Sequence, residues 1–170
     1  MAKINLDDMN QEYFDVLREI GNIGTGNATT ALSQMLNCKV DMNVPQVKLL
    51  EFSHAGELMG GEELIMAGIY LGVQGDIKGS ILFLLEKESA QKLVERLLGT
   101  PSSGDELSEM EQSALKEIGN IITASYLNSL STLTNLVIYP SVPALSVDMA
   151  GAILSVPAIV FGTIADKLLL

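Results

Sequence analysis

The chain has 170 residues, of which 48 % are hydrophobic and 18 % are charged, so it can bury the core of one domain and is unlike a disordered chain. Ten Lys and Arg residues stand against 21 Asp and Glu residues, and the net charge of −11 disfavours nucleic acid and anionic membrane surfaces as partners. The N-terminus lacks the basic start and apolar run of a secretory signal, and no run of about 18 apolar residues predicts a membrane span, so we expect a cytoplasmic protein.

The first predicted element is a long helix. Asp7 and Asp8 can cap its start, and its pattern continues to about Leu36. Two β-strands should follow it, over residues 39–44 and 47–52.

A β-hairpin and a shorter helix come next. Two β-rich runs, residues 63–73 and 77–85, are separated by a short Gln-Gly-Asp connection that is typical of a hairpin. A helix over about residues 87–98 follows and should end at Gly99, because glycine readily adopts the left-handed conformation that closes a helix.

A linker rich in Gly, Ser and Pro leads to a second long helix. Ser108 and Glu111, three residues apart, predict a capping box at its start, and the helix should end near Leu133. Two strands are expected after it, over residues 136–139 and 144–147.

The second half of the chain repeats the first after 98 residues. The motif Glu-Ile-Gly-Asn at positions 19–22 returns unchanged at positions 117–120. The match continues without a gap to Pro45 and Pro143, each placed between two predicted strands. Proline fixes its own φ and donates no backbone hydrogen bond, which suits such a junction. This self-similarity predicts a duplicated structural unit.

We therefore expect a single domain over residues 1–170 that contains two repeats, residues 8–99 and 106–170. The second repeat ends with two apolar segments, residues 149–161 and 164–170, and has no counterpart of the first repeat's hairpin. It is thus expected to be cut short at its C-terminal end.

Each long helix should carry a polar stripe on its outer face. Residues at positions i, i+4 and i+7 of a helix share a face, within about 60° of one another. The stripe residues are Asp15, Glu19 and Asn22 in the first copy and Ser113, Glu117 and Asn120 in the second. The opposite, apolar face should pack on the sheet.

Any amphipathic helix has a polar outer face, and this is the ordinary explanation of one such stripe. Two features favour a functional explanation. The Glu-Ile-Gly-Asn motif is identical in both copies, although a solvated face needs only polarity. Asn and Gly are also poor residues for the interior of a helix, so their presence there in both copies indicates a functional demand.

The available side chains limit the chemistry. The single histidine, His54, lies in a glycine-rich loop segment and is expected to be an ordinary surface residue, so no Ser-His-Asp or Cys-His arrangement is predicted. The single cysteine, Cys38, is expected to be a buried thiol without a metal-binding partner. An amide and a carboxylate remain. An amide can orient a water for attack on phosphorus, and a carboxylate can pair with a lysine.

Both copies match the pattern [Asp or Ser]-x3-Glu-x2-Asn-x22-Pro, which resembles the signature of the CheC, CheX and FliY phosphatases. The resemblance covers about residues 8–166. It implies an α/β protein of the α+β type with pseudo-twofold symmetry, in which two long helices pack on a shared antiparallel sheet.

The resemblance also implies a function, which is hydrolysis of the aspartyl phosphate on a CheY-type chemotaxis response regulator. Asn22 and Asn120 would position the attacking water, and Glu19 and Glu117 would bind the regulator's active-site lysine. The regulator would supply Mg²⁺, so this chain would need no cofactor and no metal of its own.

Two further expectations rest on the resemblance. Asp15 and Ser113, at the first position of the signature, would help to dock the regulator. Asp148 lies in a segment, residues 146–152, that resembles the site at which the family binds the deamidase CheD. The family also continues for roughly one more hairpin beyond Leu170.

The chief alternative is a non-catalytic binding protein, either an adaptor like the flagellar switch component FliY or a regulator of CheD. A ligand-binding scaffold, with its pocket between the sheet and residues 149–161, is a third possibility without a positive signal in the sequence.

Overall fold

The computed structural model describes residues 11–41, 49–51, 57, 60–102, 104–161 and 167–169. Its helices are α1 (Gln11–Leu36), α3 (Lys87–Leu98), α4 (Glu109–Thr134) and α5 (Ala150–Phe161). Its strands are β1 (Leu49–Glu51), β2 (Ile65–Gly75), β3 (Gly79–Glu86), β4 (Ile138–Pro140), β5 (Ala144–Met149) and β6 (Lys167–Leu169). No helix of this described part is long and apolar enough to cross a membrane.

Strand β2 is the centre of a four-stranded antiparallel sheet. One edge pairs with β3 along the predicted hairpin, and the other edge pairs with β5 and then with β4. Tyr70 lies opposite Ala144, and Val73 lies opposite Pro140. Strands β1 and β6 form a separate antiparallel pair, with Leu50 opposite Leu168.

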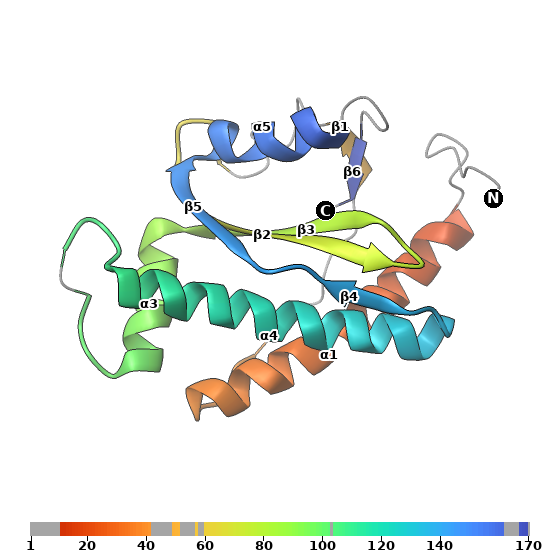
Figure 1. Ribbon diagram of the computed structural model, residues 1–170, viewed down its shortest axis with the longest axis horizontal. Coiled ribbons are helices and arrows are strands. Elements are labelled where there is room, and N and C mark those ends of the chain that lie inside the picture. Colours follow the sequence, from red (N-terminus) through yellow and green to blue (C-terminus); the bar gives the residue numbers. More distant parts are fainter. Residues whose placement is uncertain are drawn as a thin grey trace.

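The sheet lies between two layers of helices (Figure 1). Successive side chains of a strand point to opposite faces, and β2 follows this rule. Its residues Ala67, Ile69 and Leu71 are almost fully buried in the core shared with α3 and α4. Met66, on the other face, packs with Ile153 of α5. The expected α+β architecture, with two long helices on an antiparallel sheet, is confirmed.

The ends of the helices follow local signals in the sequence. The predicted capping box is present, because the Glu111 side chain accepts from the Ser108 N–H at 2.7 Å and the Ser108 Oγ accepts from the Glu111 N–H. The shorter helix α3 ends at Gly99, which has a φ of 70°. After α1 and α4 the chain turns at Asn37 and Asn135, with φ values of 48° and 57°. Asparagine is one of the few residues that adopt this left-handed conformation readily.

Several predictions about local structure differ from the structure. The hairpin strands are displaced toward the C-terminus, at Ile65–Gly75 and Gly79–Glu86 in place of 63–73 and 77–85. Residues 39–41 are irregular, so the strand predicted at 39–44 does not begin there. Strand β4 begins at Ile138, two residues later than predicted, because its pairing with β2 starts only at Gly75. Cys38 is half-buried and therefore more accessible than the buried thiol that we expected.

Several residues that the sequence analysis singled out lie outside the described residues. They include the predicted cap residues Asp7 and Asp8, the motif residue Pro45, and His54.

Candidate functional site

The polar stripes of α1 and α4 both face outward. In α1, Asp15 and Glu19 are exposed and Asn22 is half-buried. The second copy has the same gradient, with Ser113 and Glu117 exposed and Asn120 half-buried. Each helix therefore presents an accessible glutamate and, about one turn later, an asparagine that is less exposed to solvent.

The packed face of α4 explains why its stripe points to solvent. Leu115 and Ile118 are almost fully buried. Gly119, directly before Asn120, lies against the sheet so closely that a Cβ atom there would be 2.6 Å from Cγ2 of Ile69 in β2. This close approach sets the height of Asn120 above the sheet.

Helix α1 packs mainly on α4, which in turn contacts strands β2, β4 and β5, and Figure 1 shows the two long helices crossing. At the contact, Gly24 lies against the ring of Tyr126, which leaves no room for a side chain at position 24. The Asn27 Nδ2 donates to the Ser129 Oγ at 2.8 Å. Partial burial in this contact raises the pKa of Tyr126. The two stripes thus belong to one two-helix layer.

The glycines on the outer side of α1 are open. A Cβ atom at Gly21 or Gly26 would meet no atom within 4 Å. Hydroxyl groups one turn later bond the carbonyl groups of these glycines, since the Thr25 Oγ1 donates to the Gly21 O at 2.6 Å and the Thr30 Oγ1 donates to the Gly26 O at 2.9 Å. Gly26 therefore leaves the end of the first stripe free of side-chain bulk.

Charged groups on the stripes are few. Asp15 forms an ion pair with Arg18, one turn along the same helix, at 3.4 Å, and both side chains are about half exposed. Within the described ranges, no three His, Cys, Asp or Glu side chains come together in a way that could hold a metal ion. The chemistry available at each stripe is thus hydrogen bonding by an amide and pairing by a carboxylate.

A polar groove between the C-terminal halves of α1 and α4 was not predicted from the sequence. It has a volume of about 450 Å³ and begins at Ile23, directly after Asn22. Its walls carry uncharged polar side chains, among them Thr30, Gln34 and Asn128. The signal in the sequence was the high content of Ser, Thr and Asn in both helix ends, but only the crossing of the helices creates the groove.

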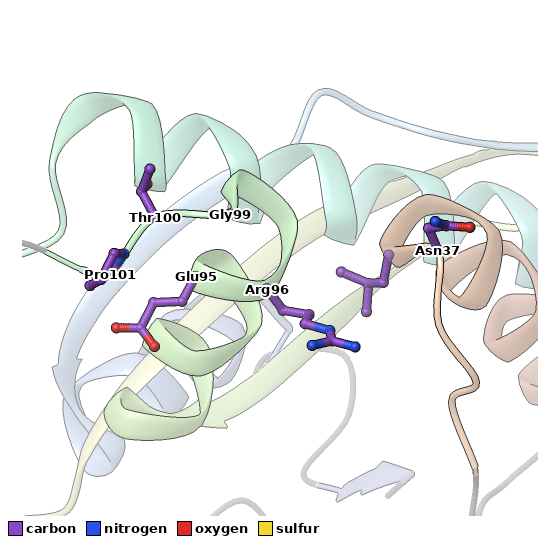
Figure 2. Close-up of a pocket in the computed structure, with 7 residues that line it drawn as sticks. Asn37, Glu95, Arg96, Gly99, Thr100 and Pro101 are labelled. Atoms are coloured by element: carbon purple, nitrogen blue, oxygen red, sulfur yellow. The ribbon is translucent and has the colours of Figure 1, made fainter.

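A second hollow, of about 430 Å³, lies where α1 and α3 end (Figure 2). The Arg96 side chain extends from α3 into the space beside Asn37, and Gly99, Thr100 and Pro101 form the other wall. No stripe residue lines this hollow, and neither hollow is lined by α5. These hollows give no support to a ligand pocket between the sheet and residues 149–161.

Asp148 lies away from both stripes, near the end of β5. It is exposed, and its Oδ1 accepts from the Met149 N–H at 2.8 Å. Its neighbours Val147 and Met149 are 40 % and 45 % exposed. Pro143, from the motif, is half-buried just before this strand.

Known proteins resemble this chain over most of its length. The model of the CheC-like family matches residues 14–49 and 110–147, and each segment contains one stripe. The chain is 44 % identical to the CheY-P phosphatase CheC of Bacillus subtilis over 148 residues, which are 85 % of this chain and 71 % of that protein. The chain belongs to the CheC-like family.

One further relative and two solved structures are also similar to this chain. The flagellar motor switch phosphatase FliY of Bacillus subtilis is 32 % identical over 130 residues, which are 75 % of this chain and 34 % of that protein. The crystal structure of FliY from Thermotoga maritima superimposes with a TM-score of 0.72 at 25 % identity, over 82 % of this chain and 70 % of that one. The FliM middle domain of H. pylori, at 16 % identity and a TM-score of 0.63 over 82 % of this chain and 74 % of that one, shares the fold.

Proposed function

We propose that this CheC-like protein hydrolyses the aspartyl phosphate of a CheY-type response regulator. The observation that carries the proposal is the 44 % identity to a CheY-P phosphatase over most of both chains. The two exposed Glu-x-x-Asn stripes supply side chains that suit this reaction. A regulator of this kind works in the cytoplasm, where this protein would then act.

In this proposal the amides of Asn22 and Asn120 position the attacking water. A neutral amide can accept a hydrogen bond from water without repelling the anionic phosphoryl group, and correct placement of the nucleophile is the main contribution that a protein makes to phosphoryl transfer. Both asparagines are half-buried. A half-buried side chain has fewer accessible rotamers, which favours such placement.

Glu19 and Glu117 would bind the regulator's active-site lysine. Both carboxylates are exposed, so a lysine at the bottom of a partner's pocket can be reached when the helix inserts. Asp15, paired with Arg18, and Ser113 would contact the rim of that pocket. The Mg²⁺ ion belongs to the phosphorylated regulator, and this chain contributes no ligand to it.

The direct test uses the phosphorylated regulator, Mg²⁺ and the double variant Asn22→Ala, Asn120→Ala. We expect this variant to fold, to bind the regulator through Glu19 and Glu117, and to lose turnover. Phosphate release above about a tenth of the wild-type rate, a barrier change below about 1.4 kcal/mol, would show that the stripes only dock the regulator, as in a non-catalytic adaptor.

A second function, binding of a CheD-type deamidase, is favoured by the surface around Asp148. Asp148 is an exposed carboxylate near the end of β5, and an accessible charged side chain of this kind can serve as a polar anchor at a protein interface. Asp148→Ala should weaken binding of CheD and leave phosphate release unchanged. Unchanged CheD affinity, or an equal loss of phosphatase activity, would remove this role.

A further inference from the structure

The two stripes differ at the position two helical turns before the glutamate that each of them contains. Glu12 lies seven residues before Glu19, and Met110 lies seven residues before Glu117, so each is on the same helix face as its glutamate. Glu12 is exposed, and Met110 is 69 % exposed. On the face of the proposed lysine-binding glutamate, the residue two helical turns earlier is therefore a carboxylate in one copy and a thioether in the other.

Apart from this position, the charged residues around the two stripes are similar. The basic residues are equivalent, since Arg18 and Lys116 occupy matching positions. The carboxylates near the stripes are Glu12, Asp15 and Glu19 on α1, and Glu109 and Glu117 on α4. Glu111 is buried in the capping box and does not face a partner. The first stripe thus has one more carboxylate, and the second has an exposed large apolar side chain, Met110, in its first turn.

Met110 contributes little to the fold. It lies in the first turn of α4, where acidic residues are favoured by the helix dipole, and most of its surface is in water. Single exposed apolar residues are common, so exposure alone carries no argument. Its place on the same face as Ser113 and Glu117 means that a partner extending about two turns from Glu117 toward the start of α4 would contact it. Methionine is also well suited to such contacts, because its flexible, polarisable side chain adapts to a partner surface.

We propose that Glu12 and Met110 make the two sites select different regulator surfaces. The α1 site prefers a phosphorylated regulator with a basic side chain beside its phosphorylation pocket, and the α4 site prefers one with an apolar side chain there. This inference rests on the proposed function and adds to it the residues that determine specificity.

The test separates the two sites. Asn22→Ala leaves only the α4 site, and Asn120→Ala leaves only the α1 site. In the protein with only the α4 site, Met110→Glu should raise KM about fivefold and leave kcat within about twofold, because the substitution removes an apolar contact formed equally in the bound and transition states. Leu133→Glu is the matched control: it makes the same type of change at the other end of α4, where Leu133 is 50 % exposed, and should leave KM unchanged.

In the protein with only the α1 site, KM should rise with salt concentration, because an exposed carboxylate that faces a basic side chain is screened. Glu12→Met should weaken that salt dependence. Glu88→Met, a matched change in the first turn of α3, should not alter it.

The outcomes distinguish this inference from the proposed function. One outcome is that both single-site proteins release phosphate while neither Met110→Glu nor Glu12→Met changes KM or its salt dependence. In that case the proposed difference in specificity between the two sites is wrong, and the phosphatase assignment stands. If the unsubstituted protein releases no phosphate, the phosphatase assignment falls. The same substitutions are then measured as affinities for a regulator loaded with beryllofluoride, and unchanged affinities overturn the inference itself.

Discussion

At the scale of single residues, Asn22 and Asn120 are the positions at which chemistry and helix stability conflict. An asparagine within a helix makes the helix less stable than Ala, Lys or Glu would. Each copy nevertheless has an asparagine three residues after its glutamate. An amide there can hold a water beside an anionic phosphoryl group, whereas a carboxylate would repel that group.

This contrast leads to a prediction for the amide. In the Asn120→Ala background, Asn22→Asp should be nearly as damaging to phosphate release as Asn22→Ala. Asn22→Gln should also fail, because the extra methylene moves the amide by about 1 Å and such displacements can cost on the order of 100-fold. Single-turnover rates measure this. A fully active Gln variant would show that the position of the water is not determined by the length of this side chain.

The two motif glycines also differ at this scale. Gly119 touches Ile69, which is 1 % exposed, while Gly21 has no neighbour within 4 Å of a Cβ position. We expect Gly119→Ala to lower the free energy of unfolding by about 1–3 kcal/mol through overpacking. Gly21→Ala should leave it unchanged or raise it by up to about 1 kcal/mol, since alanine is the better helix former. Urea unfolding of both variants tests the difference, and equal effects would contradict the packing of Gly119 on the sheet.

At the scale of the elements, the linker between α3 and α4 is held by a few side chains. The Glu95 side chain accepts from the Ser102 N–H at 2.8 Å, and the Gln91 Nε2 donates to the Gly104 O at 3.1 Å. The capping box of Ser108 and Glu111 then starts α4. The start of the helix that carries the second stripe is therefore fixed by its own linker as well as by the sheet.

This arrangement gives a prediction for the pH dependence of stability. The nearby hydroxyl group of Ser102 and then the hydrogen bonds from Ser108 lower the pKa of Glu111. A carboxyl group with a lowered pKa stabilises the folded state above its unfolded pKa, and the contribution is lost as the pH falls through the folded value. The wild type should thus be more stable than Glu111→Gln from about pH 6 to 8, with the difference shrinking below about pH 4.3. A difference in the unfolding free energy that is as large at pH 3 as at pH 7 would exclude the charged cap.

At the scale of the whole molecule, one contact joins the two halves of the helix layer. Gly24 of α1 lies under the Tyr126 ring of α4, and the bond between Asn27 and Ser129 lies one turn further along. Both stripes depend on this contact for their relative position.

A larger side chain at this contact should disturb both sites together. Gly24→Val should lower the free energy of unfolding by at least about 1–3 kcal/mol, because the tyrosine ring must move. It should also reduce phosphate release in both single-site backgrounds. Gly26→Ala, two residues on and without a neighbour within 4 Å, is the control for unfolding. Loss at the α1 site alone would show that the α4 site does not depend on this contact.

The sequence by itself determined the local structure and the composition of both stripes. The hairpin, α3, the capping box and the long helices follow from signals within a few residues, such as helical periodicity, caps and turn residues. The stripes could be predicted for the same reason, since spacing along a helix fixes which residues share a face. The roles proposed for Glu19, Asn22, Glu117 and Asn120 came from the family motif and stay predictions.

Only the tertiary structure decided which residues pack against the helices that carry the stripes. The pairing of β2 with β5, the contact of Gly119 with Ile69 and that of Gly24 with Tyr126 join residues that lie about 50–100 positions apart in the chain. Such contacts depend on how whole elements pack, and no local pattern encodes the partner of a given residue. The partial exposure of Cys38 and the polar groove between α1 and α4 arise in the same way, because both depend on which neighbouring elements cover a residue.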